Sequence, residues 1–222
     1  IHRGEAGVTH QLHDPHARLV GGALVDHAVL AVEDAVVAHE HDDRVIEFAA
    51  FAQQTMQSGY LDKTDPFVVE LGCNDGIMLK NFAAAGIRHL GIEPSRNVAE
   101  VANQKGVRTL SEFFAEGVAA QIVRDEGRAD AFLAANVMCH IPDIVGVVKG
   151  IRTLLKPRGV AIYEDPYLGD VIEKISYDQI SDEHVFLFSA PSIRYLFGLH
   201  GMELIDVQPQ VTHGGSMRYV LA

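Results

Sequence analysis

Short apolar runs alternate with amphipathic stretches along most of the chain. The apolar runs are strand-like and lie at residues 66–71, 89–93, 107–110, 129–134, 159–163, 203–207 and 217–221. Apolar positions at helical spacing occupy residues 78–85, 97–104, 111–124, 144–155 and 190–200. Strands alternating with helices of this length are typical of βαβ units, so we expect an α/β fold with a doubly wound, mostly parallel seven-stranded sheet. The last two strands are expected to pair antiparallel at one edge.

Residues 1–44 differ from the rest of the chain. They hold seven of the twelve histidines and no aromatic side chain, so they have little with which to build a core. We expect a poorly ordered His-rich tail at 1–44 and a folded domain at 45–222, beginning with an amphipathic helix over residues 44–59. A stretch from a damaged reading frame, or a zinc site on His10, His13 and His16, are the alternatives. Pro15 interrupts any helix through these histidines, and we assign no metal ligands.

Charge and composition exclude several classes of function. The chain has 18 Lys and Arg against 30 Asp and Glu, a formal net charge of −12, and no basic run, which disfavours nucleic-acid binding. It has no stretch of about 18 apolar residues, so we expect no membrane span. Its two cysteines, Cys73 and Cys139, form no disulfide framework and indicate a reducing, cytoplasmic setting. The chain begins at Ile1 and ends at Ala222 within a strand-like run, so we expect a fragment of a longer protein, and a monomer.

A glycine-rich turn after the first strand carries the strongest local motif, ELGCNDG at residues 70–76. Glycine permits a tight turn and close approach to backbone. A carboxylate 21 residues after the first glycine, at the end of the second strand, can accept both hydroxyls of a ribose. The polar side chains inside the turn disfavour a dinucleotide's diphosphate. The predicted cofactor-binding residues here are Glu70, Gly72, Asn74, Asp75, Gly76 and Glu93.

Two later segments carry candidate chemistry. Asn136 and His140 follow the fourth strand, where ligands gather in open α/β sheets. Glu183 and His184 lie in a long polar, acid-rich segment, residues 163–189, and pair a base suited to neutral pH with a neighbouring carboxylate. Each has a plainer alternative: His140 as a loop histidine bonded to backbone, and Glu183–His184 as a solvated helix start.

Five ordered segments resemble the sugar C-methyltransferases that act on nucleotide-linked keto-deoxysugars in antibiotic biosynthesis. They are residues 70–79 (ELGCNDGIML), 135–142 (ANVMCHIP), 163–170 (YEDPYLGD), 177–184 (YDQISDEH) and 212–218 (THGGSMR). The resemblance implies a Rossmann-like class I methyltransferase that takes S-adenosylmethionine as cofactor and a nucleotide-linked keto-sugar as partner. The implied reaction methylates the carbon next to the ketone, C3, of a dTDP-4-keto-deoxysugar through an enolate.

The resemblance also implies residue roles. His184 is the expected base, Glu183 lies beside it, and His140 is the expected donor near the enolate oxygen. Asn136 joins the cofactor-binding set. The residues expected to bind the substrate are Asp165, Tyr167, Tyr177, His213, Ser216 and Arg218.

Three departures from the family pattern affect these expectations. Ser181 stands where family members carry a tyrosine three residues before the base. The family begins with a cysteine-ligated zinc module, whereas residues 1–65 hold no cysteine. The family also continues into a second α/β domain. Two alternatives therefore stay open: a class I methyltransferase for another small molecule, and a truncated domain that binds S-adenosylmethionine without turnover.

Overall fold

The computed structural model describes residues 43–222, so the expected tail, apart from its last two residues, lies outside the described part of the chain. The strands are β1 (Phe67–Leu71), β2 (Arg88–Ile92), β3 (Thr109–Leu110), β4 (Ala129–Ala135), β5 (Leu155–Pro166), β6 (Leu204–Gln210) and β7 (Ser216–Leu221). The α-helices are α2 (Asp43–Gln57), α3 (Leu79–Ala84), α4 (Arg96–Gln104), α5 (Glu116–Glu126), α6 (Ile144–Leu154), α7 (Leu168–Lys174) and α8 (Ala190–Gly198). Short 3₁₀ helices are η1 (Met138–His140), η2 (Tyr177–Gln179) and η3 (Thr212–Gly214).

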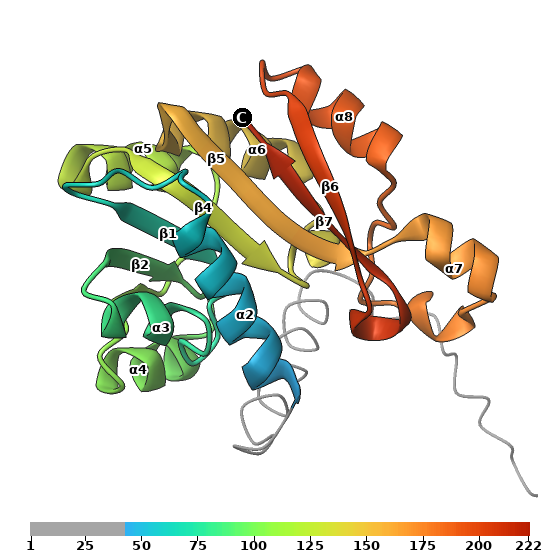
Figure 1. The fold of residues 1–222 in the computed structure, drawn as a ribbon, viewed down its shortest axis with the longest axis horizontal. Helices are drawn as coiled ribbons and strands as arrows, with labels where there is room; N and C mark the ends of the chain where they lie inside the picture. Colours follow the sequence, from blue (N-terminus) through green and yellow to red (C-terminus); the bar gives the residue numbers. More distant parts are fainter. Residues whose placement is uncertain (1–42) are drawn as a thin grey trace, which may run out of the picture.

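The seven strands form one sheet in the order β3-β2-β1-β4-β5-β7-β6 (Figure 1). Strands β1 to β5 pair in parallel, whereas β7 runs antiparallel to both β5 and β6. The predicted doubly wound sheet and its antiparallel edge pair are therefore confirmed. Consecutive strands run outward from β1 in two directions, so the carboxyl ends of β1 and β4 form the switch point of the sheet, where ligands bind in folds of this kind.

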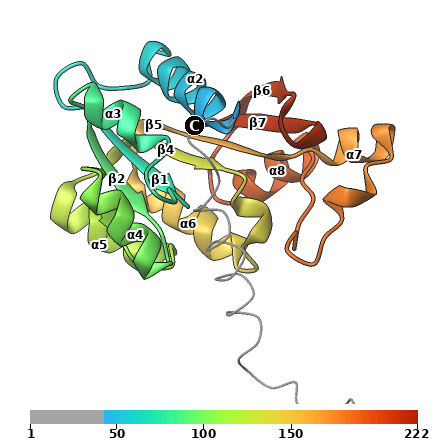
Figure 2. The same ribbon diagram turned by 90° about the horizontal axis from the view of Figure 1, so that it is seen from below.

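Helices cover both faces of the sheet (Figure 2). One face packs on α2, α3 and α4 through Phe51, Phe82 and Ala102. The other face packs on α5, α6 and α8. Neighbouring residues of β1 serve opposite cores, Val68 the first and Val69 the second, as the two-residue period of a strand requires.

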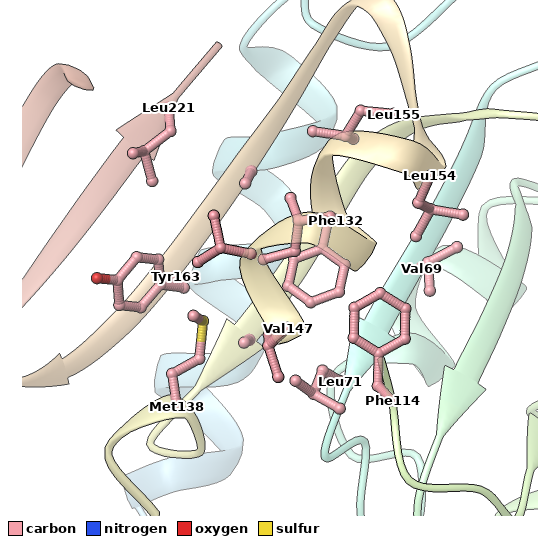
Figure 3. Close-up of a cluster of buried hydrophobic side chains, with 14 of the residues drawn as sticks. Val69, Leu71, Phe114, Phe132, Met138, Val147, Leu154, Leu155, Tyr163 and Leu221 are labelled. Atoms are coloured by element: carbon pink, nitrogen blue, oxygen red, sulfur yellow. The ribbon is translucent and has the colours of Figure 1, made fainter. Parts of the chain in front are cut away.

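The second core is the larger and surrounds α6 (Figure 3). Phe114 packs on Phe132 with ring centroids 5.3 Å apart. Tyr163 stacks on Phe197 of α8 at 5.9 Å. The aromatic side chains of β4, β5 and α8 thus hold the later half of the sheet to its helices, and they support the segment that follows β4.

The helix expected from Ser111 begins only at Glu116. Ser111 does not cap it, because its hydroxyl donates to the carbonyl of Pro94, and Phe114 enters the core before the helix starts. By contrast, Ser189 caps α8 through a reciprocal bond pair with Ser192.

Two further boundaries differ from the sequence prediction. Strand β5 starts at Leu155 and ends at Pro166, longer at both ends than expected, with a register shift against β4 between Ala129 and Ala131. The segment 163–189 is not one long loop, because α7 and η2 lie within it. The expected helix over 44–59 is present as α2.

No helix in the part of the chain described here is long and apolar enough to cross a membrane.

Candidate active site

The turn after β1 is shaped by left-handed backbone at Gly72 (φ 64°), Asn74 (φ 51°) and Gly76 (φ 84°). The predicted tight turn is therefore present. A Cβ atom on Gly72 would fall on the side chain of Val137, and one on Gly76 would lie 2.7 Å from Val107 Cγ2. Side chains of two valines therefore require glycine at these positions, and the role of both glycines toward a ligand stays a prediction.

Glu93 joins this turn to the end of β2. One carboxylate oxygen accepts the backbone N–H of Asn74 at 3.2 Å, and the other accepts that of Ser95 at 2.9 Å. Burial raises the pKa of Glu93, while these two bonds oppose the shift. Each oxygen keeps further acceptor capacity, since a carboxylate offers about four lone-pair positions. Glu93 is therefore held in place and can still accept hydroxyl groups.

Glu70 is the buried carboxylate of the site. It lies in β1, is 2 % exposed, and its Oε2 atom has no hydrogen-bond partner among residues 43–222. Burial, and then the neighbouring charge of Glu93, raise the pKa of Glu70 well above its ordinary value. A cationic group bound beside it would supply the missing partner and favour the ionised form.

Asn136 and His140 follow β4 as the sequence predicted. Asn136 takes left-handed backbone (φ 54°), its N–H donates to the carbonyl of Glu164, and its Oδ1 atom is buried without a partner. His140 ends η1, and burial, followed by the nearby His184, lowers its pKa. Two residues with unsatisfied or titratable side chains thus lie beyond the carboxyl end of β4.

The structure brings His140 and His184 together, with ring centroids 5.0 Å apart. The Nδ1 atom of His140 lies 2.9 Å from the carbonyl oxygen of Glu183, and Nδ1 of His184 lies 2.6 Å from that of Gln179. Because a carbonyl only accepts, each Nδ1 carries the proton, and each neutral ring has its lone pair on Nε2. Glu183 takes part in this contact through its main-chain carbonyl, and the residue as a whole is solvent-exposed.

A cavity of about 140 Å³ lies between α2, the ends of β4 and β5, and the turn from β6 to β7. Its wall includes Asn136, Glu164, His213, Ser216 and Arg218. Figure 1 shows the β6–β7 turn beyond the end of β5, beside α7. Three predicted substrate residues, the exposed His213 with Ser216 and Arg218, therefore border one cavity.

Arg218, which was expected to bind substrate, has its charge paired within the protein. Its guanidinium pairs with Glu164 at 2.8 Å, contacts Gln54, and lies 3.9 Å from the ring centroid of Phe51. Glu164 also accepts a bond from the hydroxyl of Thr212 at 2.7 Å. Antiparallel pairing explains the contact, because the register of β5 and β7 places Glu164 opposite Arg218. Arg218 therefore ties α2 to the sheet.

Asp165 was also expected to contact substrate, and that role stays a prediction. Its side chain is completely buried, and Oδ1 accepts the N–H of Val137 at 3.1 Å. Burial raises its pKa to about 7. Asp165 lies near the end of β5, and its carboxyl group fixes the backbone of the turn after β4.

The remaining predicted residues differ in their surroundings. Tyr167 begins α7 and is half-buried, whereas Tyr177 is 76 % exposed. Ser216 is buried, and its hydroxyl donates to the carbonyl of Thr212 at 3.2 Å. Asp75 pairs with Lys105 at the outer side of the glycine turn. Their roles toward a ligand remain predictions.

The strand order, the glycine turn and the paired carboxylates define the class: an α/β domain of the class I S-adenosylmethionine-dependent methyltransferase type. The family described as "Methyltransferase domain" matches residues 38–207, and the chain belongs to that family. Solved structures agree on the fold. An S-adenosylmethionine-dependent methyltransferase from Anabaena variabilis superposes with a TM-score of 0.65 at 16 % identity, covering 90 % of this chain and 95 % of that one. Magnesium protoporphyrin IX methyltransferase from Synechocystis, with bound S-adenosylhomocysteine, gives 0.64 at 13 % identity, covering 87 % and 94 %.

Two curated relatives are nearer in sequence. C-methyltransferase NovU from Streptomyces niveus is 39 % identical over 150 residues, which are 68 % of this chain and 36 % of that protein. A ubiquinone biosynthesis O-methyltransferase from Ralstonia nicotianae is 32 % identical over 133 residues, 55 % of each chain. The chain thus spans about a third of the length of one relative and about half of the other.

The residues around the turn fit S-adenosylmethionine. Its ammonium group matches the buried, unpartnered oxygen of Glu70, and its ribose hydroxyls match the oriented carboxylate of Glu93. Sequence reasoning found these residues but missed Gln54, Glu164 and Phe51, which shape the neighbouring cavity. Once β5 and β7 are aligned antiparallel, the pairing of Glu164 with Arg218 is the signal that could have located them.

Proposed function

We propose that this domain methylates carbon: it transfers the methyl group of S-adenosylmethionine to C3, next to the ketone, of a dTDP-4-keto-deoxysugar. The observation that carries the proposal is the pair of imidazoles, His140 and His184, held 5.0 Å apart beyond the end of β4. Identity of 39 % to a C-methyltransferase over 150 residues supports the reaction type. The sugar itself follows from the resemblance of five ordered segments.

Carbon becomes a nucleophile only after its proton is removed, and the neighbouring ketone accepts the resulting charge as an enolate. His184 is suited to take that proton, because the Gln179 carbonyl fixes its Nδ1–H and leaves the Nε2 lone pair available. S-adenosylmethionine, when bound, supplies an electrophilic methyl group. The proton on Nε2 of His184 then leaves to solvent, and carbon takes the methyl group in its place.

His140 is suited to the developing oxygen charge. Its Nδ1–H is held by the Glu183 carbonyl, so it donates to an enolate oxygen only through Nε2, after taking a second proton from solvent, a step that its lowered pKa opposes. A donor held at a developing oxyanion stabilises the charge as it forms. In this proposal the main-chain carbonyl of Glu183 orients His140. The Glu183 carboxylate takes part in no chemical step, which differs from the sequence prediction.

Proton exchange tests the proposal before methyl transfer is measured. The full chain is incubated in D₂O with a dTDP-4-keto-6-deoxysugar and S-adenosylhomocysteine, and deuterium at C3 is followed by NMR. We expect exchange in the wild type, its loss in His184→Ala, and its retention in His200→Ala, a matched control at the far end of α8. His184→Ala should leave cofactor affinity nearly unchanged, whereas Glu93→Ala should weaken it by about tenfold or more.

An O-methyltransferase is the second candidate, because several O-methyltransferases of ubiquinone biosynthesis match this chain, one at 32 % identity over 133 residues. Methylation of a hydroxyl needs no carbon–hydrogen cleavage. Cofactor binding without deuterium at C3 would therefore refute the carbon-acid reaction and favour either that activity or a domain that binds without turnover. Unchanged affinity in Glu93→Ala would refute the ribose contact alone.

A further inference from the structure

Cys139 completes a cluster with the two imidazoles. One ligand atom each from Cys139, His140 and His184 lies within 4.8 Å of the other two, with the thiol buried and both rings half-buried. The cysteine and the first histidine come from η1, and the second histidine comes from the segment after η2. No metal ligands were expected here from the sequence, because His140 and His184 are 44 positions apart.

We propose that Cys139, His140 and His184 form a binding site for a thiophilic divalent metal ion, with Zn²⁺ as the physiological candidate. Thiolate and imidazole are the ligands that Zn²⁺ prefers. In an ideal tetrahedral zinc site the ligand atoms lie about 3.3 to 3.6 Å apart, so closing around an ion requires shifts of about an ångström. Three protein ligands leave the fourth position to water.

The contacts behind the ligands are those of a prepared site. Metal-bound histidines usually donate their second ring nitrogen to a carbonyl or carboxylate, which fixes the tautomer and the ring. Both rings already do so, His140 to the Glu183 carbonyl at 2.9 Å and His184 to the Gln179 carbonyl at 2.6 Å. The N–H of Phe186 donates to the carbonyl of Cys139 at 3.1 Å and holds the two segments together. Folding has therefore already oriented the ligand-bearing groups.

Binding is a ligand exchange without redox change. The hydrated ion gives up all of its waters but one and forms one bond to sulfur and two to nitrogen, while the thiol of Cys139 releases its proton to solvent. Each ring binds through Nε2, since its Nδ1 is held by a main-chain carbonyl.

Cobalt(II) is a direct probe, because a cobalt–thiolate bond gives a charge-transfer band in the near ultraviolet and tetrahedral cobalt gives visible d–d bands. The full chain can be used: residues 1–42 contain seven histidines but no cysteine, so any cobalt bound there would give no thiolate band. Cys73 and Cys139 are the chain's two cysteines, both buried and free. Cys73→Ser is thus the matched control for Cys139→Ser.

We expect the thiolate band in the wild type and in Cys73→Ser, and its loss in Cys139→Ser. His140→Ala and His184→Ala should each raise the cobalt concentration needed for half-saturation by about tenfold or more. Zn²⁺ should abolish the band by displacing cobalt. Circular dichroism and S-adenosylmethionine binding confirm that each variant is folded. A folded wild type without the band, or a band that depends on Cys73, would overturn the proposal.

A second readout rests on the proposed function. Metal on His184 occupies the lone pair that removes the C3 proton, so Zn²⁺ should stop deuterium exchange in the wild type and a chelator should restore it. Exchange in Cys139→Ser should tolerate about tenfold more Zn²⁺. If metal-free protein shows no exchange at all, the proposed reaction fails, while the cobalt band still decides the metal site by itself.

Discussion

Replacing Gly72 by alanine tests the packing of the turn after β1. Gly72 has a φ of 64°, where a side chain costs about 1–2 kcal/mol. The new Cβ would also fall on Val137 Cγ2, with Val137 Cβ at 3.2 Å from the same point, so the whole valine side chain obstructs it. Overpacking of this kind costs about 1–3 kcal/mol. The two effects together predict a loss of about 2–5 kcal/mol in the free energy of unfolding.

A double-mutant cycle separates the two contributions. In Val137→Ala the obstruction is gone but the left-handed backbone remains, so Gly72→Ala should cost only about 1–2 kcal/mol in that background. Urea unfolding of the wild type, both single variants and the double variant gives the coupling energy, expected at about 1–3 kcal/mol in favour of the double variant. An equal cost of Gly72→Ala in both backgrounds would refute the assignment of Val137 as the obstructing group.

Three further predictions concern buried polar groups and a helix cap. Glu164→Ala should destabilise the fold by about 3–5 kcal/mol in urea unfolding, because it leaves Arg218 buried without its anion, and Arg218→Met should cost less. Ser189→Ala should lose about 1 kcal/mol in thermal unfolding, since it removes the capping box of α8. The pKa of Glu70 is higher in the folded than in the unfolded state, so its contribution to wild-type stability is complete below the unfolded-state pKa and is lost as the pH rises above it. The cofactor-free Glu70→Gln variant should therefore become more stable relative to wild type as the pH rises. Parallel pH profiles of melting temperature in Glu70→Gln and wild type would exclude Glu70 as the source.

The strands were predictable because their apolar runs are buried on both faces. All five residues of β1 are buried, and so are residues 129–134 of β4. Boundaries were less predictable where tertiary contacts compete with local preference. Ser111 is a good helix cap in isolation, but the Pro94 carbonyl takes its hydroxyl and Phe114 is drawn onto Phe132 before the helix begins.

The candidate site was predictable where a motif stays within one turn, and less so where it depends on long-range pairing. Glu70 and Glu93 followed from spacing along one βαβ unit. Asp165 and Arg218 looked like ligand-binding residues because both are charged and lie at strand ends. The structure places Asp165 against the Val137 backbone, which depends on the register of β4 and β5, and pairs Arg218 with Glu164, which depends on the register of β5 and β7.

The two proposals concern the same lone pairs. His140 and His184 each donate Nδ1–H to a main-chain carbonyl, which leaves Nε2 available and holds the rings close together. That arrangement suits a base that takes a proton from carbon, and it equally suits a soft metal ion once Cys139 is beside it. A proton and a metal cannot occupy one lone pair, so the occupancy of the metal site sets the fraction of protein able to start the carbon-acid reaction. Exchange rates measured at increasing free Zn²⁺ should therefore follow the fraction of protein without metal. The free Zn²⁺ concentration that halves the rate should equal the Zn²⁺ dissociation constant calculated from the displacement of cobalt.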